Sequence, residues 1–66
     1  MKLTLKAARV NSGFTQKYVA KHMHVNASTI SSWEASKTFP TANKLAQLCE
    51  LYGVGIDDIF LLKQQG

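Results

Sequence analysis

The apolar residues of this chain recur at intervals of three and four residues, in short segments separated by residues that begin or end helices. Val19 and Met23 lie four residues apart in one such segment. Leu45, Leu48 and Tyr52 follow the same spacing in another. No segment of four or more residues alternates apolar and polar side chains as a half-buried strand would. The spacing therefore predicts an all-α fold built from five short helices.

Capping residues indicate where these helices begin and end. Threonine and asparagine side chains accept hydrogen bonds from the first turn of a helix, and glycine readily adopts the left-handed conformation that ends one. The expected N-caps are Thr4, Thr15, Asn26 and Thr41, and the expected terminating glycines are Gly13 and Gly53. Pro40 separates the third helix from the fourth. A short fifth helix is expected from about Ile56, where Asp57 and Asp58 suit the positive end of the helix dipole.

Composition is that of a small globular protein. The 66 residues are 45% hydrophobic and 18% charged, which predicts one domain over residues 1–66. The single cysteine, Cys49, excludes an intramolecular disulfide and suits a reducing cytosol. No apolar run has the length of a membrane span, and the N-terminal segment lacks the apolar region of a signal peptide. We therefore expect a soluble cytoplasmic protein with no membrane partner.

Charge is distributed unevenly along the chain. Residues 1–49 contain seven lysines and arginines against one acidic residue, a balance of +6. Residues 50–66 contain one lysine against three acidic residues, a balance of −2. A basic body of this kind suits a polyanionic partner, although a small protein with a basic isoelectric point needs no such partner.

The segment from Asn26 to Thr38, NASTISSWEASKT, is rich in short polar side chains at positions expected to be helical. Serine and threonine are only fair helix formers, because their hydroxyls compete for backbone hydrogen bonds. If Ile30 and Trp33 point into the core, helical geometry turns the remaining short side chains outward. The outward residues would be Ser28, Ser31, Ser32 and Ala35. Such a face is either a set of tolerated surface residues, since surface hydroxyls are common, or a binding surface.

The stretch FTQKYVAKHMHVNASTISSWEASKTFP, residues 14–40, resembles the helix-turn-helix family of phage repressor and Cro proteins, the lambda-repressor-like or XRE-type domains. The shared pattern is Thr-Gln, Val-Ala, Ser-Thr-Ile-Ser, Trp-Glu, Lys and Pro. Apolar residues fall at the positions that the motif buries, which are Val19, Met23, Val25, Ile30 and Trp33, and Ala20 lies where the two helices would touch. The tail pattern LAQLCELYGVGIDDIF fits the last two helices. The resemblance implies a compact five-helix domain with the helix-turn-helix at about residues 16–35.

The resemblance also implies a function for the hydroxyl-rich face. In this family the third helix lies in the major groove, and two copies of the domain bind a palindromic operator as a homodimer. A transcriptional regulator, of the repressor type found in phages and mobile elements, is therefore expected. The implied base contacts are Ala27, Ser28 and Ser32, with Ser31 close by. The implied contacts to the DNA backbone are Gln16, Asn26, Lys37 and Thr38, with Lys17 and Lys6 weaker candidates. Each lysine taken singly is also explained as a solvated surface charge.

Two further positions acquire structural roles from the resemblance. Family members often join the first and third helices by an Arg–Glu pair, here Arg9 and Glu34, so we assign this arginine to the fold and not to DNA. The chain departs from the family pattern at His24 and Ser36, where glycine is common. Either position is expected to require a positive φ.

Other classes of function have weaker support. His22 and His24 lack a nearby cysteine or acid that would complete a metal site, and Cys49 fits a small buried hydrophobe. No catalytic constellation or phosphate-binding loop can be assembled, so neither enzyme activity, a cofactor nor a small-molecule ligand is expected. The remaining alternative is a protein-interaction module such as an antitoxin or adaptor, supported by the apolar run at residues 59–62. Within that run, Leu61 and Leu62 are expected to form a dimer surface.

Overall fold

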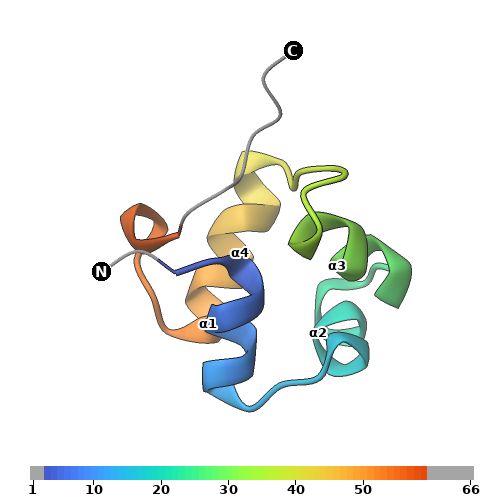
Figure 1. The fold of residues 1–66 in the computed structure, drawn as a ribbon, viewed down its shortest axis with the longest axis horizontal. Coiled ribbons are helices and arrows are strands. Elements are labelled where there is room, and N and C mark those ends of the chain that lie inside the picture. Colours follow the sequence, from blue (N-terminus) through green and yellow to red (C-terminus); the bar gives the residue numbers. More distant parts are fainter. Residues whose placement is uncertain (1–2, 60–66) are drawn as a thin grey trace.

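The computed structural model describes residues 3–59, which fold into four α-helices and one turn of 3-10 helix. The elements are α1 (Leu5–Ser12), α2 (Gln16–Met23), α3 (Ala27–Glu34), α4 (Ala42–Tyr52) and the 3-10 turn η1 (Ile56–Asp58). Figure 1 shows α2 and α3 together on one side of the molecule, with η1 on the side away from α3. No strand occurs among the described residues, and the all-α prediction is confirmed.

The helix boundaries follow the capping residues. Thr4, Thr15 and Thr41 each accept a hydrogen bond from the backbone N–H three residues later, at 3.0 to 3.3 Å. Gly13 and Gly53 end α1 and α4 in the left-handed conformation, with φ of 81° and 71°. These five predicted caps are confirmed, since each depends on contacts within one turn of helix.

The short fifth helix predicted from about Ile56 is present as the single 3-10 turn η1, which starts at Ile56 and ends after three residues. Its first turn is closed by Asp58, whose carboxylate accepts a hydrogen bond from the Gly55 N–H at 3.1 Å. The chain then becomes extended at Ile59, which is 8% exposed and forms a parallel bridge with Leu3. Entry of this side chain into the core draws the backbone out of the helix.

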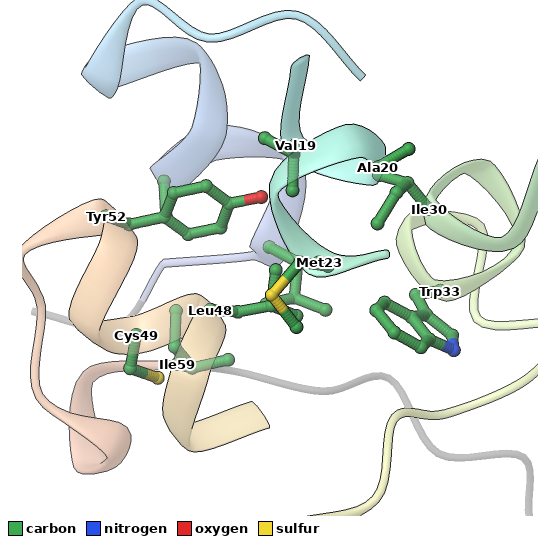
Figure 2. Close-up of a cluster of buried hydrophobic side chains, with 11 residues drawn as sticks. Val19, Ala20, Met23, Ile30, Trp33, Leu48, Cys49, Tyr52 and Ile59 are labelled. Carbon is green, nitrogen blue, oxygen red and sulfur yellow. The ribbon is translucent and has the colours of Figure 1, made fainter. Parts of the chain in front are cut away.

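A cluster of eleven buried hydrophobic residues joins the described elements. Its members are Leu5, Ala8, Val19, Ala20, Met23, Ile30, Trp33, Leu48, Cys49, Tyr52 and Ile59. Figure 2 shows the side chains of Ile30 and Trp33 reaching from α3 toward Met23. Cys49 is 4% exposed, and burial raises the pKa of its thiol, which confirms its interpretation as a small core residue. Because Ile30 and Trp33 are the residues of α3 in this cluster, the core contacts α3 on one face only.

Among residues 3–59, two non-glycine residues adopt the left-handed conformation, at the two positions where the family pattern has glycine and a positive φ was expected. His24, with φ of 59°, ends α2, and Ser36, with φ of 61°, lies in the loop after α3. The steric cost of such a conformation is on the order of 1 kcal/mol for a residue with a Cβ atom.

Replacing His24 by glycine is expected to raise the free energy of unfolding by about 1 kcal/mol, because glycine adopts this φ without strain. His24 is exposed, so little packing is lost. Lys21→Gly is the matched control: it puts glycine inside α2 at helical φ and should lower stability by about 1 kcal/mol. Urea denaturation measures both. Equal destabilisation by the two variants would contradict the strain at His24.

The buried phenol of Tyr52 predicts a loss of stability in alkali. Burial raises its pKa to about 12, with the nearby Glu34 charge as a smaller cause. The unfolded phenol titrates near 10, so the stabilisation is complete below about pH 10 and disappears as pH rises through the folded value. The shift corresponds to a contribution on the order of 2 kcal/mol.

The measurement is the free energy of unfolding between pH 8 and pH 12, for the wild type and for Tyr52→Phe. The wild type should lose stability more steeply above about pH 10, since the variant has no phenol to ionise at this position. Parallel curves for the two proteins would show that ionisation of Tyr52 does not oppose folding.

Candidate nucleic-acid interface

The short turn between α2 and α3 sets how the two helices cross. The left-handed His24 reverses the chain, and the Val25 N–H donates to the Ala20 carbonyl at 2.9 Å. Ala20 is buried and lies beside Ile30 where α2 and α3 meet (Figure 2). Its small side chain allows close approach of the two helices, as expected from the sequence.

α3 presents a face of short side chains to solvent. Ile30 is 1% exposed and Trp33 is 8% exposed, so both point into the core. Within residues 27–35, which are α3 and its C-cap, the exposed positions are Ala27, Ser28, Ser31 and Ala35, and Ser32 is half-buried. The spacing of Ile30 and Trp33 thus predicts the orientation of α3 correctly. A helix surface bearing only methyl and hydroxyl groups is low enough for its axis to approach a groove closely.

The loop after α3 folds back onto the end of the helix. The Lys37 N–H donates to the Ser32 carbonyl at 3.0 Å, and the Thr38 N–H approaches the same oxygen at 3.5 Å. Both side chains are exposed. The loop therefore holds a lysine and a threonine beside the C-terminal turn of α3.

Arg9 and Glu34 form an ion pair that fastens α3 to α1. The Arg9 Nε donates to Glu34 at 2.6 Å, and a second guanidinium nitrogen donates to the other carboxylate oxygen at 3.2 Å. A third Arg9 nitrogen donates to the Phe14 carbonyl at 2.8 Å. The pair is largely buried, with side chains 11% and 5% exposed, and the hydrogen bond that Arg9 donates to Glu34 raises the pKa of Arg9. Arg9 is thus occupied within the fold.

Gln16, which the resemblance assigns to the DNA backbone, forms a hydrogen bond within the fold that the sequence did not indicate. Its side-chain nitrogen donates to Glu34 at 2.9 Å, which places the amide against the ion pair. A carboxamide nitrogen carries two N–H groups, so one donor is engaged and the other remains for a ligand. The only signal for this contact was the position of Gln16 at the start of the second helix.

Residues from three helices surround a hollow of about 180 Å³ beside α3. It is lined by Lys6, Gln16, Ser31, Glu34 and Ala35. The hollow brings Lys6, which the sequence reasoning ranked as a weaker candidate, next to the exposed face of α3. Lys17, also exposed, follows Gln16 in the first turn of α2.

Asn26 occupies the N-cap position of α3, but it differs from the other three side chains at α-helix N-caps. Its backbone carbonyl accepts from Thr29 at 2.9 Å and from Ile30 at 3.3 Å. Its side chain makes no cap hydrogen bond, and the residue is exposed. The prediction of an N-cap residue is therefore confirmed in position, while the amide group is not used for capping.

The predicted dimer surface cannot be located in the described part of the chain, and neither a metal site nor a membrane-spanning helix is found there. Leu61 and Leu62, the expected dimer surface, lie outside the described residues, as does most of the apolar run behind the protein-interaction alternative. Within residues 3–59, no group of three or more histidine, cysteine or acidic side chains gathers to hold a metal ion. None of the helices in that range is long and apolar enough to cross a membrane.

Comparison with known proteins gives a consistent result. A family model described as helix-turn-helix matches residues 5–59. The HTH-type transcriptional activator BcrR of Enterococcus faecalis is 29% identical over 55 residues, covering 83% of this chain and 27% of that protein. The HTH-type transcriptional regulator ImmR of Bacillus subtilis (strain 168) is 34% identical over 53 residues, covering 80% and 42%. The chain thus aligns with less than half the length of either relative. No solved structure matches it.

Proposed function

Because this chain belongs to the helix-turn-helix family, we propose that it is a DNA-binding transcriptional regulator that inserts α3 into the major groove. The observation that carries the proposal is the orientation of α3, with Ile30 and Trp33 buried and the short side chains exposed. The names of the two relatives, a transcriptional activator and a transcriptional regulator, support the same function.

The charge around the interface also suits DNA. Glu34 is the single acidic residue among residues 1–49, and its carboxylate is bound by Arg9 and Gln16. The one negative charge of α3 is therefore neutralised within the fold. The exposed Lys17 and Lys37 leave positive charge for contacts with phosphates.

We assign contacts by position on this surface. Base edges are read by the exposed side of α3, and the sequence-predicted readers are Ala27, Ser28, Ser31 and Ser32. Hydroxyls accept or donate toward either base edge, and a methyl group packs on the methyl of thymine. The proposed contacts to the DNA backbone are Gln16 through its remaining N–H, together with Lys17, Lys37 and Thr38. These contacts set the register of α3 without selecting a sequence.

The operator and the assembly form the finer part of the proposal. Two copies of a single domain would bind an imperfect palindrome, with their α3 helices in successive major grooves about 34 Å apart. We favour repression as the mode of regulation: the protein would occupy such an operator of a phage or mobile element in the cytoplasm. The resemblance to phage repressor and Cro proteins supports it. Leu61 and Leu62 are the proposed dimer contacts.

Selection of bound sites from a random pool of duplex DNA tests the proposal directly. Recovery of one palindromic consensus is the expected result, and recovery of random sequence would contradict specific recognition.

Ser28→Ala should then change the preference at one operator position by about 1–3 kcal/mol, with the fold intact. An unchanged consensus would remove Ser28 from the reading face.

Lys37→Ala separates phosphate contacts from base contacts. It should weaken binding to all sequences alike and flatten the dependence of log affinity on log salt by about one unit, because one fewer counterion is released. Lys44→Ala, at a half-buried position in α4, is the control and should leave the slope unchanged. A loss confined to particular sequences would instead make Lys37 a base reader.

A further inference from the structure

The exposed face of α3 contains few groups that select one base over another. Within residues 27–35 the exposed side chains are methyls and hydroxyls, and the one charged residue, Glu34, is bound by Arg9 and Gln16. A hydroxyl serves as donor or acceptor, so it discriminates poorly between bases. Sharp discrimination requires a side chain with two groups held in one plane, and α3 itself exposes none.

Asn26 directly precedes this face and has such a side chain. At the other three α-helix N-caps, the hydroxyls of Thr4, Thr15 and Thr41 each accept a hydrogen bond from a backbone N–H of their own helix. The Asn26 side chain makes no cap bond, and the residue is exposed. Asparagine is a good capping residue, so an unused amide at this position is available for a ligand.

We propose that Asn26 determines specificity by reading an adenine through both groups of its amide. The carboxamide presents a donor and an acceptor side by side, and adenine presents the complementary N7 acceptor and N6 donor in the major groove. The residues at the N-terminal end of a recognition helix are those that reach base edges, and Asn26 immediately precedes Ala27 and Ser28 there. The inference rests on the proposed function. The inference predicts that each half-site of the operator contains an adenine opposite the N-terminal end of α3.

This assignment differs from the contact with the DNA backbone that the sequence analysis expected of Asn26. A phosphate contact uses only the amide N–H groups and is blind to sequence. A bidentate contact uses the amide oxygen as well, and it distinguishes adenine from the other bases by about 10- to 100-fold in affinity. The two roles therefore give opposite results in a comparison of operators.

The experiment measures affinity for the selected operator and for versions with each base pair replaced in turn, using the wild-type chain and Asn26→Ala. The wild type should prefer adenine at one position of each half-site by about 10- to 100-fold, and the variant should lose that preference alone. Asn26→Asp should also lose it, because a carboxylate has no N–H to donate to the ring nitrogen. A uniform loss across all operators, or an unchanged preference, would overturn the inference.

Replacing that adenine by 7-deazaadenine removes the N7 acceptor and leaves the base pair intact. The analogue should weaken binding of the wild type and have no further effect on Asn26→Ala, because the variant no longer uses N7. Equal weakening of both proteins would show that another residue contacts this atom, and the inference would fail.

Thermal unfolding checks that the variant is folded. Asn26→Ala should leave the midpoint nearly unchanged, whereas Thr15→Ala should lower it, since of these two side chains Thr15 alone makes a cap bond. A lower midpoint for Asn26→Ala, similar to that of Thr15→Ala, would show that the amide acts as a cap and would count against the inference. The two proposals fail in different ways. A wild-type protein that binds no DNA would refute the proposed function. Sequence-specific binding without an adenine preference that depends on Asn26 would refute this inference alone.

Discussion

Glu34→Ala is expected to lower the free energy of unfolding by about 3–5 kcal/mol, because it leaves the largely buried Arg9 guanidinium without its carboxylate. The total stability of a domain this small is about 3–10 kcal/mol, so the variant should be partly or wholly unfolded near physiological temperature. Arg9→Met should have an effect of similar size, since it leaves the carboxylate with only the Gln16 donor. Urea denaturation followed by circular dichroism measures both.

Two control variants test whether burial is the cause. Glu50→Ala makes the same chemical change at an exposed position of α4 and should alter stability by no more than about 0.5 kcal/mol. The double variant Arg9→Met, Glu34→Ala combines the two single substitutions and should cost clearly less than their sum, because no unpaired charge then remains buried. If the double variant lost the sum of the two single effects, the ion pair would not be the source of the destabilisation.

Trp33→Ala is expected to cost about 3–5 kcal/mol of stability, because the indole fills the space between α3 and the rest of the core. The loss should also abolish DNA binding at temperatures where the variant is unfolded, since α3 is then no longer positioned. Denaturation followed by circular dichroism is the measurement, because the substitution removes the only tryptophan of the chain.

The matched control for Trp33→Ala is Phe39→Ala, which removes an aromatic side chain that is 39% exposed in the loop before α4. Its cost should stay below that of Trp33→Ala by about 2 kcal/mol or more, because less apolar surface returns to water. Similar costs for the two variants would mean that Trp33 does not anchor α3, and the assignment of the exposed face would have to be abandoned.

Local interactions explain why the helix ends were predictable. The bonds from Thr4, Thr15 and Thr41 reach only three residues along the chain, so residue type and spacing are sufficient to locate them. The same holds for the inward direction of Ile30 and Trp33, which follows from helical periodicity. The left-handed conformations of His24 and Ser36 agree with the expectation drawn from the family resemblance, and no local pattern predicted them.

Contacts between distant residues explain what was not predictable. The bridge between Leu3 and Ile59 joins the two ends of the described chain, and no local pattern around Ile56 indicates that it replaces a helix with a single 3-10 turn. The bond between Gln16 and Glu34 arises only when α2 and α3 are packed together. A glutamine at the start of a helix is suited equally to a phosphate and to a neighbouring carboxylate.

The sequence by itself determined the helical class, the helix boundaries set by threonine and glycine, and the face of α3 that enters the core. Each of these depends on side chains within one or two turns of each other, where the backbone geometry is known in advance. Only the tertiary structure decided which polar groups remain free. Packing commits Arg9 to Glu34 and one donor of Gln16 to the same carboxylate, while it leaves the Asn26 amide without a cap bond. Whether a polar side chain is already engaged depends on which distant groups the fold brings within hydrogen-bond distance.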